Sequence, residues 1–132
     1  MRRRSVANDL AEVGKAVAWA DAIALEAGVS DRVRQDLQVC LEEALANLIM
    51  HGRADGDKAI AFKVRANPAG VELRIFDRCA PFDVTKAELR QLEAGRSGGA
   101  GLRLLRGLAS ELRYGSLWGR NKLTVILRER TN

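Results

Sequence analysis

The chain has 132 residues, of which 47% are hydrophobic and 30% are charged. This length and composition are typical of one globular domain with a single core, so we expect residues 1–132 to form one domain. A net charge of +5 raises the question of nucleic-acid binding, but the basic residues are spread along the chain and aromatic residues make up only 5%. Because single-stranded nucleic acids are bound largely by stacking on aromatic side chains, the composition argues against a nucleic-acid partner.

The sequence also lacks the patterns that membrane proteins, secreted proteins and metal-cluster proteins have. No apolar run is long enough to span a bilayer, and no apolar segment of signal-peptide length follows the basic residues 2–4. We therefore expect a cytoplasmic protein with no membrane partner. Cys40 and Cys79 lie too far apart for a disulfide framework and lack metal-site spacing, so buried structural roles are expected for both.

Two helices are predicted first along the chain. The first begins after Asn8, a good N-cap, and ends at Gly28, a residue that commonly follows a helix. The second begins after Ser30 and ends at Gly52. Apolar residues recur at helical spacing in both: Leu10, Val13, Val17, Ala20 and Ala24 in the first, and Leu37, Cys40, Leu41, Ala44 and Leu48 in the second.

The pattern then changes to the alternation typical of strands. Residues 60–64 and 71–75 alternate around the turn sequence 67–70, which predicts a hairpin. Residues 85–94 allow a helical turn or two, a third helix is predicted after Gly99, and alternation returns at residues 112–114 and 123–127. This order predicts an α+β fold, a two-layer sandwich with a mixed sheet covered by helices on one face.

The second helix contains the first candidate site. Glu43, Asn47 and His51 follow one another at intervals of four residues, which places them in a strip on the flank of the apolar stripe. The carbonyl oxygen of Asn47 suits Mg²⁺, which needs few protein ligands, and Glu43 suits a general base. A solvated helix flank explains the same strip when it is considered alone.

Two further motifs follow at the end of the hairpin and before the third helix. Asp77, directly after a buried strand, can present a carboxylate to a donor such as an adenine amino group, although Asp is also common in turns. The segment 95–102 is rich in glycine and precedes a helix, an arrangement that lets backbone amides approach phosphate oxygens. A simple hinge would have the same composition.

The three motifs occur in the order and spacing of the N, G1 and G2 boxes of GHKL ATPases, at residues 42–52, 77–83 and 98–105, with residues 83–97 as a short ATP lid. The chain resembles most closely the anti-sigma factor serine/threonine kinases (RsbW-like), and the similarity extends from about residue 8 to the closing strands. The resemblance implies a Bergerat-type sandwich, with the sheet mostly antiparallel, that binds ATP and Mg²⁺.

The resemblance also implies roles for individual residues. Glu43 would be the catalytic base, Asn47 the Mg²⁺ ligand and Asp77 the partner of the adenine amino group. Arg96 is placed by its position alone at the phosphates, and an exposed, solvated arginine is the plainer interpretation. The other residues that the resemblance places at the nucleotide are His51, Phe82, Gly98, Gly99, Gly101 and Leu102.

By resemblance, the function is that of an anti-sigma factor that phosphorylates a STAS-type antagonist, with a sigma factor as second partner and dimerisation as a further expectation. The chain departs from the family at Cys79, where the G1 box has glycine. A side chain there is expected to crowd the adenine and weaken nucleotide binding. The alternative function is therefore a catalytically degenerate module that binds nucleotide or sequesters a partner without phosphoryl transfer.

Overall fold

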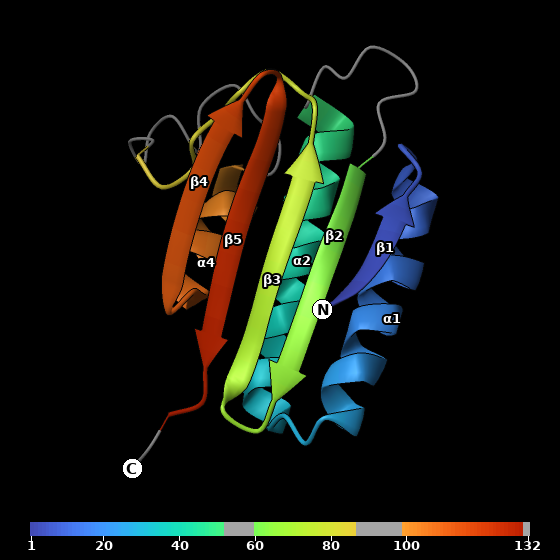
Figure 1. Ribbon diagram of the computed structural model, residues 1–132, viewed down its shortest axis with the longest axis vertical. Coiled ribbons are helices and arrows are strands. Elements are labelled where there is room, and N and C mark those ends of the chain that lie inside the picture. Colours follow the sequence, from blue (N-terminus) through green and yellow to red (C-terminus); the bar gives the residue numbers. More distant parts are fainter. Residues whose placement is uncertain (52–59, 87–98, 131–132) are drawn as a thin grey trace.

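A computed structural model describes residues 1–51, 60–86 and 99–130. In chain order the elements are β1 (Arg2–Val6), a 3₁₀ turn (Leu10–Glu12), α1 (Val13–Glu26), α2 (Asp31–His51), β2 (Ile60–Asn67), β3 (Gly70–Asp77), α4 (Gly99–Leu108), β4 (Glu111–Leu117) and β5 (Arg120–Arg128). Figure 1 shows the five strands side by side with the helices behind them. None of the helices within these residues is long and apolar enough to cross a membrane.

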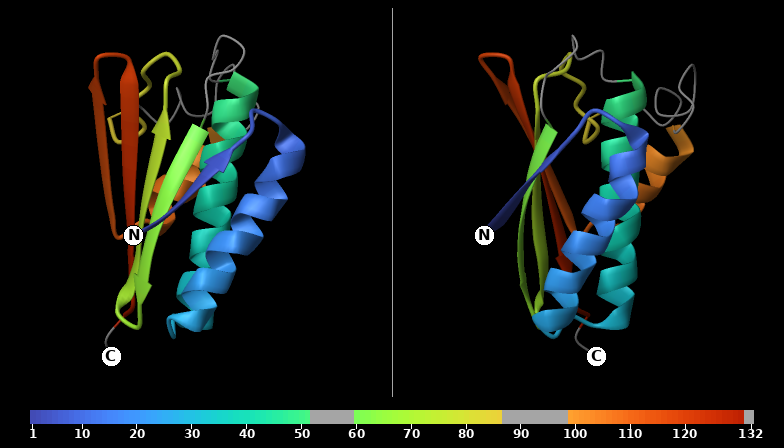
Figure 2. Two further views of the ribbon diagram at one scale, coloured as in Figure 1. Left: turned by 45° about the vertical axis from the view of Figure 1, so that its right-hand side comes forward. Right: turned by 90° about the vertical axis from the view of Figure 1, so that its right-hand side faces the viewer.

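The sheet has the strand order β1-β2-β3-β5-β4. Each of the four pairings within the described residues is antiparallel. Seen edge-on, the helices cover one face and leave the other open (Figure 2). The predicted α+β sandwich is confirmed, and the sheet, expected to be mixed and mostly antiparallel, is antiparallel at every described pairing.

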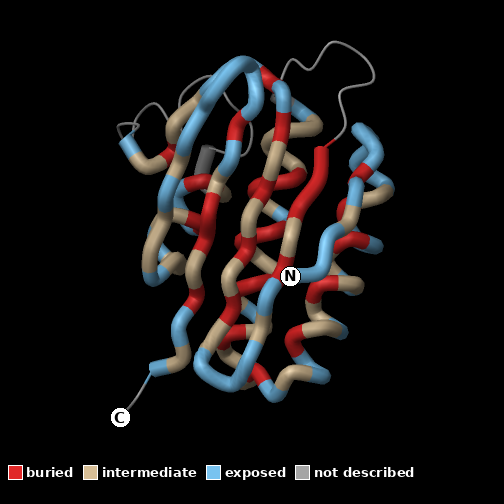
Figure 3. The backbone as a smooth tube through the Cα atoms, in the orientation of Figure 1, coloured by how far each residue is buried: buried red, intermediate tan, exposed pale blue. Residues whose placement is uncertain are grey.

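The core lies between the sheet and the helices. Side chains alternate between buried and partly exposed along β3, and buried residues recur along one side of α1 and α2 (Figure 3). Cys40 is fully buried on α2, and this burial raises the pKa of its thiol to about 12. A thiol that stays protonated at neutral pH is a poor nucleophile, which fits the structural role expected for Cys40.

The N-terminal region differs from the prediction in two ways. The basic residues 2–4 belong to β1, which pairs with β2, and the guanidinium groups of Arg2 and Arg4 lie 5.6 and 5.8 Å from the ring centroid of Trp19. Asn8, the predicted cap of the first helix, caps neither element: Asp9 caps the 3₁₀ turn by accepting a hydrogen bond from the amide of Ala11, and α1 begins after Glu12.

The predicted apolar stripe of the first helix is confirmed within α1, where Val13, Ala20 and Ala24 are buried and Val17 packs against the core. Leu10 is the exception and is 50% exposed. It lies in the 3₁₀ turn at residues 10–12, which has three residues per turn and does not continue the spacing of the α-helix. Ser30 caps α2 by accepting from the amide of Val33, and the hairpin, the third helix and the closing strands lie where the sequence pattern placed them. The helical turns expected at residues 85–94 fall mostly outside the described residues.

Candidate functional site

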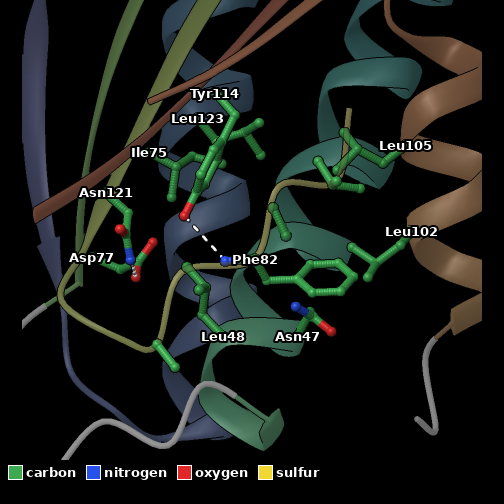
Figure 4. Close-up of a pocket in the computed structure, with 13 residues that line it drawn as sticks. Asn47, Leu48, Ile75, Asp77, Phe82, Leu102, Leu105, Tyr114, Asn121 and Leu123 are labelled. Carbon is green, nitrogen blue, oxygen red and sulfur yellow. Dashed lines mark hydrogen bonds between the residues drawn. The ribbon is translucent and has the colours of Figure 1, made fainter. Parts of the chain in front are cut away.

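A cavity opens where α2 and α4 meet the ends of β3 and β5. Four of the residues predicted from the sequence line it, namely Asn47, Asp77, Phe82 and Leu102 (Figure 4). Most of the remaining wall is apolar, with Ile75 and Leu123 contributed by the sheet and Leu48 and Leu105 by the helices. An apolar cavity with a few polar groups at its ends is typical of a small-molecule site.

Asp77 is 7% exposed at the end of β3, and its carboxylate is held in one orientation. Its Oδ1 atom accepts hydrogen bonds from the backbone amide of Cys79 (2.9 Å) and from Nδ2 of Asn121 (2.7 Å). No hydrogen bond to Oδ2 is made within the described residues, so this oxygen remains an acceptor for a ligand. Asp77 therefore presents one fixed acceptor to the cavity.

Asn121 is a site residue for which the sequence predicted no role. Besides Asp77, its Nδ2 group donates to the carbonyl of Cys79 (2.9 Å), and its Oδ1 accepts from the hydroxyl of Ser116 (2.6 Å). Asn121 is the second residue of β5, directly opposite Asp77 in the antiparallel register and 44 residues away along the chain. The two residues are brought together only by the pairing of β3 with β5. The sequence contains a weak indication of a site residue here, because a polar Asn stands near the start of an otherwise alternating strand.

Asn47 supplies a polar atom that the fold leaves unsatisfied. Its Oδ1 atom is buried and has no hydrogen-bond partner within the part of the chain that the structure describes. In Figure 4 the ring of Phe82 lies beside Asn47 and Leu102. A buried acceptor without a partner is destabilising, so its retention points to a ligand that completes it. An amide oxygen is a suitable ligand for Mg²⁺, and the residue therefore fits the predicted metal.

Glu43 lies one turn before Asn47 on α2 and contacts α4. Its carboxylate packs against Gly101 so closely that a Cβ atom at Gly101 would collide with Glu43 Oε2. Gly101 is in the first turn of α4, whose N-terminal amides favour a neighbouring negative charge. The predicted base and the predicted glycine are thus in contact, next to Leu102 in the chain, although neither is among the described residues that line the cavity.

Phe82 and Tyr114 connect the cavity to the last hairpin. The backbone amide of Phe82 donates to the hydroxyl of Tyr114 at 3.1 Å. Burial raises the pKa of Tyr114, and the nearby carboxylates of Asp77 and Asp83 add to the effect, so the phenol stays protonated near neutral pH. Its hydroxyl proton is available to an acceptor in the cavity.

The side chain of Cys79 does not lie at the cavity, where it was expected from the sequence to crowd the adenine. Its side chain is 5% exposed, but it is not among the described residues that line the cavity. Its backbone instead makes the turn that holds Asp77, because the amide binds Asp77 and the carbonyl binds Asn121. This placement argues against the crowding of the adenine that the sequence suggested.

Some predicted site residues fall at or beyond the limits of the described chain. Arg96, Gly98 and the predicted lid from residue 87 onward lie outside the described residues. His51 is the last residue of α2 and Gly99 is the first of α4, and only their backbone positions are described. The lid and the phosphate contacts therefore stay predictions.

Comparisons with known proteins agree with this geometry. Residues 6–128 match the family model of the histidine kinase-like ATPase domain. The chain is also 36% identical over 115 residues to the serine/threonine-protein kinase BtrW of Bordetella bronchiseptica, an alignment that covers 83% of this chain and 81% of the relative.

Proposed function

Because the chain belongs to the histidine kinase-like ATPase family, we propose that it binds Mg-ATP in the cavity and phosphorylates a serine or threonine of a protein partner. One observation carries the proposal: the buried, unpartnered Oδ1 of Asn47 lies in the same cavity as the oriented carboxylate of Asp77. The first suits a metal-bound phosphate, and the second suits the amino group of a base.

At the base end, the chain's own residues orient the nucleotide. Asn121 and the amide of Cys79 fix Oδ1 of Asp77, so that Oδ2 faces a donor without loss of conformational freedom on binding. The apolar walls formed by Ile75, Leu123 and Leu48 suit a planar ring. A donor that pairs with Asp77 is the amino group of adenine, which guanine lacks at the equivalent position.

At the phosphate end, we propose that Asn47 helps to hold Mg²⁺, which when bound would neutralise phosphate charge. Glu43 then accepts the proton of the attacking serine or threonine hydroxyl. The hydroxyl oxygen bonds to the γ-phosphorus, the bond from that phosphorus to the bridging β–γ oxygen breaks, and ADP leaves. Positioning and charge neutralisation are the main requirements of phosphoryl transfer, so few protein groups are needed.

The contact between Glu43 and Gly101 gives a first test. In Gly101→Ala the new Cβ displaces the Glu43 carboxylate, so we expect phosphoryl transfer to fall about tenfold or more at saturating Mg-ATP, beyond any loss of nucleotide affinity. Fold stability should not fall, because alanine is favoured over glycine in a helix by up to about 1 kcal/mol. Kinetic assays and thermal melts measure the two effects.

Gly107→Ala is the matched control in the same helix. A Cβ atom at Gly107 meets nothing within 4 Å. This variant should gain the same helix stability and keep full phosphoryl transfer. Equal losses of transfer in the two variants would show that α4 itself, and not the Glu43 contact, is responsible.

We further propose that the partner is a STAS-type antagonist and that the protein also binds a sigma factor, as anti-sigma factor kinases do. The similarity to a serine/threonine-protein kinase supports the first partner. Dimerisation belongs to the same proposal. Titration calorimetry with Mg-ATP and Mg-ADP, followed by transfer from labelled ATP to the STAS-type proteins of the same genome, tests it.

The expected results are binding of both nucleotides and phosphate on a serine or threonine. Binding without transfer to any of these proteins would favour the second candidate, a module that binds nucleotide and sequesters its partner without catalysis. The departure from the family at Cys79 suggested this alternative from the sequence, although the Cys79 side chain is not among the described residues that line the cavity. Failure to bind either nucleotide would overturn both.

A further inference from the structure

The open face of the sheet has a cluster of positive charge at the end where β3 terminates. Phe76 lies on this face, because its neighbours Ile75 and Asp77 point into the cavity on the helical side. The surrounding residues of the face share a positive charge and form what we call the cationic cluster: Arg3, Lys63, Arg78, Arg120 and Lys122. A groove runs between Arg3, Phe76, Arg78 and Arg120, and Asp77 also lines it, with its Oδ1 atom engaged by Asn121 and by the amide of Cys79.

Within the described residues, no member of the cationic cluster forms an ion pair. Among the described carboxylates that the strands place on the open face, Glu72 is engaged with Arg65 and Arg74, and Glu111 with Arg113 and Arg128. Lys63 and Arg120 instead lie over the ring of Phe76, 5.6 and 5.1 Å from its centroid. The positive charge of the cluster is therefore left for an external partner.

The hairpin that joins β4 to β5 places an exposed tryptophan beside this cluster. Leu117 pairs with Arg120, which leaves Trp118 and Gly119 as a two-residue loop with φ values of 51° and 75°. Two positive φ values favour Asn-Gly, and a bulky residue at the first position is strained. Trp118 is also 92% exposed and Leu117 66% exposed, so neither gains burial in the fold. Strain without burial points to a role outside the fold.

We propose that the cationic cluster and the hairpin tip, Leu117 and Trp118, form one docking surface for an acidic segment of a partner protein. Carboxylates of the segment pair with Arg78, Arg120 and their neighbours, and an apolar side chain of the segment is buried against Trp118. Tryptophan and arginine are the residues most enriched where protein interfaces gain their binding energy. Arg120 joins the two parts, since it pairs with Leu117 and lies over Phe76.

Two other occupants fit less well. A single-stranded nucleic acid is held by stacking successive bases on several aromatic side chains, but this surface offers only the ring of Trp118 among the described residues, because the Phe76 ring has Lys63 and Arg120 over it. A second copy of the chain would bring two cationic clusters together, and like charges repel. The surface lies on the face of the sheet opposite the nucleotide cavity, so the proposal does not depend on phosphoryl transfer.

Fluorescence anisotropy tests the surface with a labelled acidic peptide of glutamates and aspartates that contains one leucine and one phenylalanine. The variant Arg78→Glu/Arg120→Glu should weaken peptide binding by about tenfold or more. The control Lys15→Glu/Arg65→Glu changes the net charge equally, on α1 and at the opposite end of the open face. It should weaken binding by less than about threefold. Mg-ATP affinity should stay at the wild-type value in both.

Trp118→Asn separates the docking role from a structural one. Asparagine accepts the left-handed conformation, so the melting temperature should rise by about 3 °C. Peptide affinity should nevertheless fall at least fivefold, by about 1 kcal/mol on the tenfold-per-1.4 kcal/mol scale. A variant in which stability rises and binding falls is not explained by a structural role for Trp118.

Three results would overturn the proposal. Equal weakening by the cluster variant and its charge-matched control would show unspecific attraction. Unchanged peptide affinity in Trp118→Asn would remove the hairpin tip from the surface. Tighter binding of an oligothymidylate of the same net charge, lost in Arg78→Glu/Arg120→Glu, would assign the surface to nucleic acid.

Discussion

Glu43→Gln is expected to lower phosphoryl transfer by about 10²-fold or more while Mg-ATP affinity stays within about twofold of the wild type. Glutamine keeps the size of the side chain and can still pack against Gly101, but it does not accept a proton at neutral pH. The expected change is therefore in the rate constant of transfer and not in nucleotide affinity. Single-turnover transfer from labelled ATP and titration calorimetry measure the two quantities.

Glu42→Gln is the matched control for this prediction. Glu42 is the adjacent residue on α2 and is exposed, and it does not line the nucleotide cavity. The same loss of charge there should leave transfer unchanged. If Glu43→Gln transferred phosphate at the wild-type rate, Glu43 would not be the base, even though the nucleotide cavity could still be correctly identified.

The fold could be predicted from the sequence wherever local patterns determine it. The second helix, the hairpin around residues 67–70 and the closing strands follow from helical spacing, alternation and turn residues. The first strand could not be predicted, because Arg2, Arg3 and Arg4 resemble a basic tail. They become a strand through pairing with β2, a contact between residues about 60 positions apart in sequence.

Only part of the candidate site could be predicted, because the sequence reveals local spacing but not the pairing of distant strands. Glu43 and Asn47 share one helix, so their spacing alone places them on one side. Asp77 and Asn121 are brought together only by the pairing of β3 with β5, and no local pattern announces such a pair. The role of Cys79 was likewise hidden, since a family comparison shows which residue is unusual but not which way its backbone and side chain face.

Asn47 and Trp118 share a property that identifies them as functional candidates. Each is unfavourable for the folded chain on its own, Asn47 through a buried acceptor without a partner and Trp118 through an exposed side chain at positive φ. Natural proteins depart from the local rules of stability mainly where function requires it. Substitutions at both positions should therefore separate stability from binding.

Asn47→Leu is expected to make the ligand-free protein more stable by about 1 kcal/mol, because an apolar side chain of similar shape replaces the unsatisfied acceptor. The same variant should lose the gain in ATP affinity that Mg²⁺ provides. Denaturant unfolding without nucleotide measures the first effect. Calorimetry of ATP with Mg²⁺ and with EDTA measures the second.

Asn47→Asp is the complementary variant, since it keeps an oxygen at the same position and adds negative charge. It should retain the dependence of ATP binding on Mg²⁺, because carboxylate oxygens are good ligands for that ion. The metal assignment requires opposite outcomes for the two variants. If Asn47→Leu bound Mg-ATP as tightly as the wild type, the unpartnered oxygen would not be a metal ligand. If Asn47→Leu were instead less stable without nucleotide, Asn47 would be stabilising the fold, and the argument from its buried acceptor would fail.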